Sequence, residues 1–515
     1  MSSYLIDSRT LPDGHEVSAD ICVIGGGAAG LTVVRELIAS GLTVAVFEAG
    51  ALNPRAVDRD LLECEIAGHP YPIDETRLRY FGGTANHWGG QCVPLDSHDF
   101  ERLSYVPYSG WPYGLETLAP YYRRATEHLR LGGDRFDADA VAREVGAELI
   151  DFSGTSVRNV LARYNRFRFG LELTDRFEEL DDVSVYYCAD LIDLTLQDDS
   201  SLITSASFRT TAGNTVTAKA RKFILATGGI ETARLLLSIN RQRPAGLGNG
   251  NDLVGRFWQD HPWVYSGTMV FWDEIPPTDL YFSTIQRGEH GVRVHIALTP
   301  EAEIENEIPA FRAEVRSSSE ASILRHQLAS GDIGVRDIGR FLARIDDLGA
   351  SELCNAPQDV ASFDLANYFQ MKPDPENRVR LGEQRDMFDR PLPALDFRFG
   401  MEAAETIGRA HRLIADDMLR RGLGRFRIET DEEALGDPGR HHWGAHHMGT
   451  TRMSVNPNEG VADADARVHE TDNLYIAGSA LFPTCGWQNP TLTIVATAMK
   501  LADHLKLQFR AEGAL

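Results

Sequence analysis

The chain has 515 residues, of which 43% are hydrophobic, and a formal net charge of −24 from 51 basic and 75 acidic residues. A chain of this length exceeds the size at which one hydrophobic core usually divides, so we expect two interleaved domains with ample core. The acidic balance disfavours nucleic acids and anionic membrane surfaces as partners. The sequence contains no apolar run of about 18 residues, so we expect no membrane span.

The cysteines carry no pairing signal. They are Cys22, Cys64, Cys92, Cys188, Cys354 and Cys485, and none forms a C-x-x-C pair. The first residues are too polar for a signal peptide. We therefore expect reduced thiols and a cytoplasmic location.

Residues 20–50 read as strand, glycine turn, helix and strand. The turn carries G-x-G-x-x-G as Gly25, Gly27 and Gly30, and Glu48 closes the second strand about twenty residues further on, where an acid can bind a ribose diol. The pattern predicts a dinucleotide site, with a purely structural turn as the alternative. It does not choose between FAD and NAD(P), although its place near the N-terminus favours FAD and the acid argues against NADP.

Further segments follow in chain order. Residues 80–91 are rich in glycine around His87 and Trp88, which suggests backbone pressed against a flat ligand. Residues 111–148 look helical. Four strands in an antiparallel meander are expected at 183–188, 191–196, 202–208 and 215–220, followed by a second strand, glycine turn and helix from Lys222. Short alternating strands then fill 259–430, interrupted by a charged, helical-looking segment around 320–348.

These patterns predict an α/β fold: a Rossmann-like dinucleotide-binding domain, with FAD the favoured ligand, interleaved with a substrate domain, the latter built on a mostly antiparallel sheet with flanking helices. We expect the boundaries to divide the chain into five parts. The FAD-binding domain takes 1–105, 180–258 and 441–515, the last with the active-site segment; 106–179 is a helical connection and 259–440 the substrate domain.

Two segments near the C-terminus carry candidate chemistry. His441, His442, His446 and His447 lie within seven residues. A metal site is the first alternative, but no run of carboxylates or thiols and no second ligand cluster accompanies them, so we expect no metal. Asn489 precedes a proline and reads as a helix N-cap, and such a helix points its positive end at what lies before it.

The order of these motifs resembles the glucose–methanol–choline (GMC) family of FAD-dependent alcohol oxidoreductases over nearly the whole chain. The shared stretches are 20–50, 82–90, 226–229, 446–453 and 478–493. Within the family the chain is most similar to the branch of pyranose 2-oxidase and bacterial sugar and glycoside 3-oxidases, because His87 follows Gly83-Thr-Ala-Asn86 and because His446 is matched with Asn489 rather than a second histidine.

The resemblance implies roles for individual residues. His446 matches the catalytic histidine and Asn489 its partner, with His447 and Gln488 as supporting neighbours. His87 matches a histidine that is bonded to the flavin in pyranose 2-oxidase, but relatives with this pattern also bind FAD without a bond, so the link stays open. The residues expected to hold FAD are Gly25, Gly27, Gly30, Glu48, Ala49, Gly83, Thr84, Asn86, His87, Trp88, Gly89, Gly90, Ala226, Thr227, Gly228, Gly478, Ser479, Asn489, Pro490 and Thr491.

The implied activity is oxidation of a secondary alcohol of a sugar or glycoside to a ketone, at C2 or C3 of a pyranose, with O2 as the oxidant and hydrogen peroxide as product. A quinone or other acceptor in place of O2 would make the enzyme a dehydrogenase. Further alternatives are an NAD-dependent or unrelated flavin enzyme, a lyase that keeps FAD as a structural part, and a binding subunit. Since the segments that build the pyranose 2-oxidase tetramer are not apparent, we expect a monomer or dimer.

Overall fold

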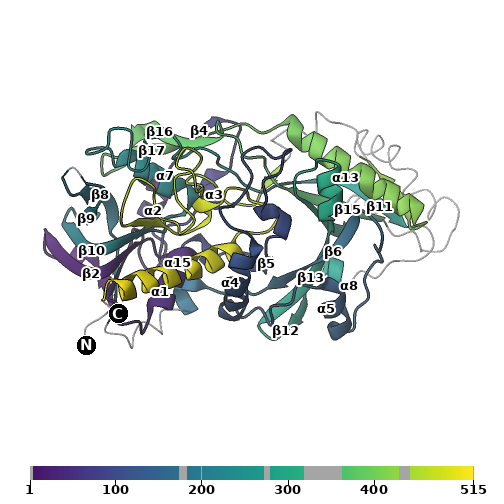
Figure 1. Cartoon of the computed structure of the whole chain (residues 1–515), viewed down its shortest axis with the longest axis horizontal. Helices are drawn as coiled ribbons and strands as arrows, with labels where there is room; N and C mark the ends of the chain where they lie inside the picture. The colour runs from purple at the N-terminus through teal and green to yellow at the C-terminus, as the bar shows by residue number, and fades with distance from the viewer. Residues whose placement is uncertain are drawn as a thin grey trace, which may run out of the picture.

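The computed structural model describes residues 4–172, 182–198, 200–271, 279–317, 362–428 and 441–513. The charged segment expected to be helical around 320–348 lies outside these residues. Two large sheets form the two halves of the molecule, and the long C-terminal helix α15 (Thr491–Ala511) runs beside α1 (Ala28–Leu37) under the first (Figure 1).

The first sheet is the nucleotide-binding type that the sequence predicts. Its strand order is β1-β7-β3-β2-β10-β9-β8, and β20 also pairs with β10. The strands β1, β7, β3, β2, β10 and β20 are mutually parallel, whereas β9 and β8 are antiparallel to their neighbours. Their bounds are β1 Leu5–Asp7, β2 His15–Ile24, β3 Val44–Glu48, β7 Val183–Tyr187, β8 Asp190–Leu196, β9 Ile203–Arg209, β10 Thr215–Leu225 and β20 Leu474–Ile476.

The predicted four-stranded meander is wrong in two respects. Strand β7 does not join it, because Val183–Tyr187 pairs in parallel with β3. Strand β10 is one continuous strand through residues expected to form two, since its first half pairs with β9 and its whole length pairs with β2. The meander therefore consists of β8, β9 and the start of β10, and it extends the parallel sheet directly.

The second sheet is antiparallel throughout its described strands, in the order β18-β11-β15-β14-β13-β6-β5, with β12 on β13 and β19 on β11. Its strands are β5 Gln91–Cys92, β6 Val157–Tyr164, β11 Pro262–Phe271, β12 Ile285–Arg287, β13 His290–Leu298, β14 Phe311–Ser317, β15 Ser362–Phe369, β18 Gly424–Arg427 and β19 His442–Trp443. The helix α13 (Met401–Arg420) covers one face, where His411 contacts Asn367. The opposite face carries Tyr368 and Trp263, whose rings stack on each other, and Trp263 also stacks on His442 of β19. The predicted fold class is thus confirmed.

Smaller elements connect the two sheets. A three-stranded sheet consists of β16 (Arg378–Arg385), β17 (Pro391–Phe397) and β4 (Glu65–Gly68). The helical stretch expected over 111–148 contains two helices, α4 (Leu115–His128) and α5 (Ala138–Val145). The other described α-helices are α2 Ala56–Asp60, α3 Ile73–Thr76, α7 Gly228–Ser238, α8 Asp279–Phe282 and α9 Pro300–Glu305.

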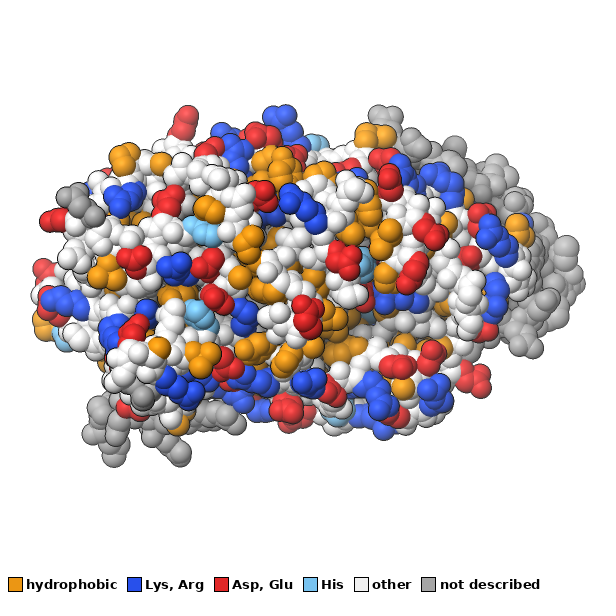
Figure 2. Space-filling model, viewed as in Figure 1, with side chains coloured by type: hydrophobic (Ala, Val, Ile, Leu, Met, Phe, Trp, Pro, Cys, Tyr) orange, Lys and Arg blue, Asp and Glu red, His pale blue; other side chains and the backbone are white. Residues whose placement is uncertain are grey.

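The surface mixes both signs of charge despite the net charge of −24. On the face shown in Figure 2, acidic and basic side chains are interspersed around its rim, and hydrophobic side chains gather toward the middle. Among the described residues, no helix is both long enough and apolar enough to cross a membrane.

Candidate active site

Two other segments that the sequence singles out, 82–90 and 226–229, meet the glycine turn after β2. Gly25 has φ +110°, and a Cβ there would lie 2.5 Å from the carbonyl oxygen of Ala226, while one at Gly30 would lie 2.1 Å from the oxygen of Gly25. The Gly82 N–H donates to the Gly26 carbonyl at 2.7 Å. A side chain at either Gly25 or Gly30 would therefore push the turn away from β10 or break the start of α1.

The same turn forms a cradle that fits a dinucleotide. Gly27 occupies the N-cap of α1 and no side chain caps this helix end. Apart from neighbouring backbone, no atom of the described residues lies within 4 Å of where a Cβ would stand at Gly27 or at Gly228. Uncapped N–H groups at a helix N-terminus beside open backbone are suited to a pyrophosphate, so the residues present fit the phosphate portion of FAD.

Glu48 is fixed at the end of β3. One carboxylate oxygen accepts the Gly26 N–H at 2.8 Å and the other accepts the Gly50 N–H at 2.6 Å. A carboxylate oxygen has more than one lone pair, so Glu48 keeps capacity to accept from a ribose diol. Burial raises the pKa of Glu48, and the two backbone bonds and Arg79 oppose that rise.

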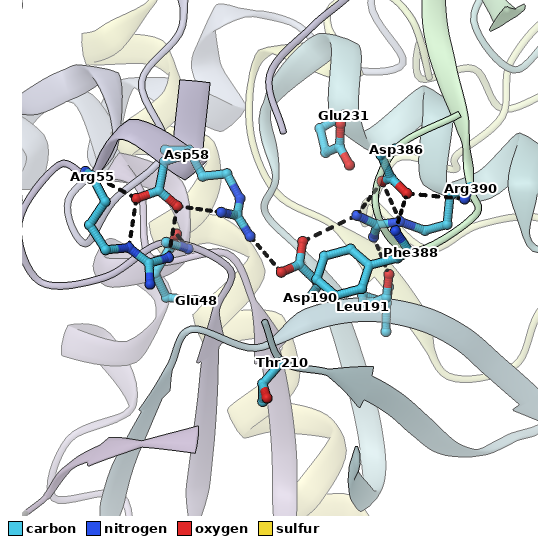
Figure 3. A network of polar contacts seen from close by, with 12 residues as sticks. Glu48, Arg55, Asp58, Asp190, Leu191, Thr210, Glu231, Asp386, Phe388 and Arg390 are labelled. Atoms are coloured by element: carbon cyan, nitrogen blue, oxygen red, sulfur yellow. Dashed lines mark hydrogen bonds and ion pairs between the residues drawn. The ribbon is translucent and has the colours of Figure 1, made fainter. Parts of the chain in front are cut away.

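A buried network of alternating charges lies beside Glu48 (Figure 3). Arg79 bridges Asp58 and Asp190, the latter at 2.5 Å, and Asp190 continues to Arg390 at 3.2 Å. Arg390 binds Asp386 at 2.7 Å. The network joins the loop after β3 to the hairpin between β16 and β17, and so holds the chain around the expected ribose site.

The stretch 82–90 contributes backbone more than side chains. The Asn86 amide donates to the Phe81 carbonyl at 2.9 Å and accepts from Gly170 N at 3.1 Å, and Trp88 donates to the Phe167 carbonyl at 2.7 Å. Those polar groups brace the loop. His87 is exposed and its ring packs against Tyr80, with 5.8 Å between ring centroids, so it is accessible for a covalent link that stays a prediction.

His446 and Asn489 lie side by side. The Nε2 of His446 is 3.5 Å from the Nδ2 of Asn489, and both side chains are only partly buried. Asn489 was expected as a helix N-cap, but Pro490 holds that position and no side chain caps α15. The amide of Asn489 is instead directed at the imidazole, while the uncapped start of α15 lies directly behind it.

Sequence reasoning missed the residues that hold His446 in place. His261 has its Nδ1 2.9 Å from the Nδ1 of His446 and its Nε2 2.9 Å from the Gly486 carbonyl oxygen. The buried Asp260 accepts the backbone N–H of His261 at 2.7 Å and that of His446 at 2.8 Å through the same oxygen. Its other oxygen accepts the Tyr71 hydroxyl at 2.6 Å.

The environment keeps these histidines neutral. Burial, with a smaller contribution from the positive charge of Arg312, lowers the pKa of His446 to about 3. Burial and the neighbouring His446 likewise lower the pKa of His261 to about 3, although Asp260 opposes this. Arg312 comes from β14, is fully buried and lies 3.9 Å from the ring centre of Tyr368.

The four clustered histidine rings diverge. His447 lies 3.1 Å from the Tyr71 hydroxyl, His442 stacks on Trp263, and His441 packs against Phe399. Nowhere in the described part of the chain do three or more His, Cys, Asp or Glu residues gather as a metal would require.

The remaining expected residues surround the same region. Ser479 donates to the His447 carbonyl at 2.8 Å, Gln488 donates to Asp99 at 3.0 Å, and Thr227 contacts Thr232 at 2.9 Å. Gly478 lies against Ala29 in α1. Thr84 accepts from Leu78 N, and a Cβ at Gly90 would meet Asn165, whereas Gly89 is exposed. Ala49 follows directly after β3, and Thr491 is the first residue of α15.

The chain is similar in sequence and in fold to several known proteins. The family profile of GMC oxidoreductases matches residues 373–498. The fructose dehydrogenase large subunit of Gluconobacter japonicus is 23% identical, over 95% of this chain and 98% of that protein. The C-glycoside 3-oxidase of Arthrobacter globiformis is 32% identical over 25% of each chain. A structure of Aspergillus oryzae formate oxidase superposes with a TM-score of 0.57 at 17% identity, covering 97% of this chain and all of the other, which supports the fold.

Proposed function

The chain belongs to the GMC oxidoreductase family, and from this premise we propose that it is an FAD-dependent oxidoreductase that converts a secondary alcohol of a sugar or glycoside to a ketone. The observation that carries the proposal is the 3.5 Å approach of His446 to Asn489 beside the uncapped start of α15. A base and an amide placed to contact one hydroxyl can remove its proton and fix its orientation, which suits alcohol oxidation.

The roles follow from the chemistry of the two side chains. A neutral imidazole can accept the hydroxyl proton on Nε2, and the low pKa of His446, about 3, keeps the ring neutral at ordinary working pH. The Asn489 amide orients the same hydroxyl by a hydrogen bond. FAD, when bound, supplies the hydride acceptor; the residues around Gly27 and Glu48 would hold its pyrophosphate and ribose.

The substrate class rests on the relatives. The names of fructose dehydrogenase and C-glycoside 3-oxidase refer to a sugar and to glycosides, which supports a hydroxyl group of such a molecule as the substrate. The two names differ in the electron acceptor: an oxidase uses O2, whereas a dehydrogenase uses another acceptor. The first candidate for this chain is O2, with release of hydrogen peroxide. The second is a quinone or other acceptor, which would make the enzyme a dehydrogenase. Cytoplasmic location and a monomeric or dimeric state stay predictions.

The decisive experiment is anaerobic reduction of the purified holoenzyme. We expect the flavin absorbance to bleach with one or more members of a panel of sugars and glycosides and to return on admitting air. His446→Ala should slow bleaching by about 10²–10⁴-fold with FAD still bound. A holoenzyme that no alcohol bleaches, or a His446→Ala variant that bleaches at the full rate, would refute the proposal.

A further inference from the structure

The hydrogen bonds around the base determine which nitrogen can act. The Gly486 carbonyl oxygen can only accept, so the 2.9 Å contact to it requires a proton on Nε2 of His261. A neutral imidazole carries one N–H, so Nδ1 of His261 must be an acceptor. The 2.9 Å contact between the two Nδ1 atoms then requires a proton on Nδ1 of His446. The lone pair of His446 is therefore on Nε2, the nitrogen beside Asn489.

We propose that His261 is the positioning residue of the base: its Nδ1 fixes His446 in the tautomer whose Nε2 accepts the substrate's hydroxyl proton, and its ring then shares the resulting charge. This inference rests on the proposed function. As the O–H bond breaks, the proton joins Nε2 of His446, and the electron pair stays on the substrate oxygen. The Nδ1–H···Nδ1 bond to His261 thereby becomes charge-assisted, and such bonds are roughly twice as strong as neutral ones.

The surroundings explain why a partner is needed. Burial and Arg312 make the neutral base available, but they also penalise the protonated ring, which would make His446 alone a weak base. An imidazole that accepts at Nδ1 offsets part of that penalty. Asp260 is the negative group on this side of the site, and it fixes both backbones through one oxygen, which holds the two rings at bonding distance.

Two substitutions at His261 separate positioning from packing. In His261→Asn the amide oxygen stands close to where Nδ1 stood and still accepts from His446. In His261→Leu the volume is kept but the acceptor is lost, so the His446 proton is free to move to Nε2. A wrong tautomer in a comparable histidine base costs up to about 10⁴ in rate.

The measurement is the rate of anaerobic flavin reduction across pH in holoenzymes of matched flavin content, with a substrate found in the panel. We expect His261→Leu to be about 10²–10³-fold slower and to recover as pH rises, since hydroxide then replaces the base. His261→Asn should stay within about tenfold of the unmodified protein. His411→Leu is the matched control, because His411 is equally buried but packs on the opposite face of the same sheet.

A double variant distinguishes this inference from the proposed function. If His261 acts through His446, His261→Leu should add almost nothing to the loss caused by His446→Ala. Equal losses in the Asn and Leu variants with an unchanged pH profile, or full additivity with His446→Ala, would overturn the positioning role while leaving the proposed function intact. Full-rate reduction in His446→Ala would instead remove the proposed function itself.

Discussion

The buried charge network beside Glu48 gives a prediction whose size follows from its contacts. Asp386 is 1% exposed; it accepts from Arg234 Nη2 at 2.6 Å, from Arg390 Nε at 2.9 Å and from the backbone of Phe388 at 2.9 Å. Asp386→Asn keeps the shape and the backbone bonds but leaves two buried guanidiniums facing an amide. Removing one partner of a buried pair costs about 3–5 kcal/mol.

The expected loss lies near the lower end of that range, because each arginine keeps a second acid. Arg234 retains Glu231 at 2.9 Å and Arg390 retains Asp190 at 3.2 Å. We therefore expect Asp386→Asn to lower the free energy of unfolding by about 3 kcal/mol, a large part of the roughly 5–15 kcal/mol that stabilises most domains. Urea unfolding followed by tryptophan fluorescence measures it through the shift of the midpoint.

The control is Asp389→Asn on the same hairpin. Asp389 is 86% exposed and lies 3.5 Å from Arg385, and exposed pairs contribute about 0–1 kcal/mol. Its φ of +64° is one that asparagine also tolerates. Equal shifts in the two variants would refute the argument that burial makes the network stabilising.

The dependence of stability on pH provides a second check. Burial raises the pKa of Asp386, but Arg390 and Arg234 overcome this and hold it below its usual value. Its stabilising contribution should therefore be lost only as pH falls through that lowered pKa.

Three further predictions address the cofactor cradle, pH and metals. Gly30→Ala, whose Cβ would lie 2.1 Å from the Gly25 oxygen, should weaken FAD retention at least about tenfold. Gly408→Ala, whose Cβ would lie 3.8 Å from the end of the Arg412 side chain, should leave retention unchanged, and the ratio of flavin to protein absorbance measures both effects. Burial raises the pKa of Glu402 to about 7, so its contribution to stability is lost as pH rises toward and through 7, and Glu402→Gln should gain in thermal midpoint over the unmodified protein at pH 8 but not near pH 4. Exhaustive dialysis against EDTA should leave flavin reduction unchanged, because the described residues offer no metal-binding group of side chains; loss of reduction restored by one metal would contradict that.

Local patterns made the nucleotide half of the fold predictable. The strand, turn and helix around Gly25 and Gly30 depend on residues close in sequence, and their steric demands are set by the turn itself. The same holds for Asn489-Pro490 at the start of α15, although the helix begins one residue later than a capping asparagine would allow. Strand β7 was misassigned because its alternating pattern suits an antiparallel neighbour as well as a parallel one, and only the pairing with β3 decides.

The residues that support the proposed catalytic pair could not be predicted in the same way. His261 meets His446 because Pro262 and Trp263 in β11 pair with Trp443 and His442 in β19, which lie 181 and 179 residues further along the chain. No periodicity in the sequence reports such a pairing. One usable signal was present: an Asp-His pair immediately before a proline that opens a strand, where the side chains are at a strand end rather than within the ladder.

The proposed catalytic pair, His446 and Asn489, depends on both large sheets, so its geometry is sensitive to how the two sheets pack together. His446 follows β19 and is positioned by the antiparallel sheet, whereas Asn489 precedes α15, which packs beside α1 on the parallel one. The 3.5 Å gap between their nitrogens therefore reports how the two sheets are set against each other. Tyr71 is at that junction: its ring packs on Trp258, Trp443 and Phe397, and its hydroxyl binds Asp260. If the proposed function is right, a change that loosens this contact should alter the rate of alcohol oxidation, while the turn after β2 continues to bind FAD.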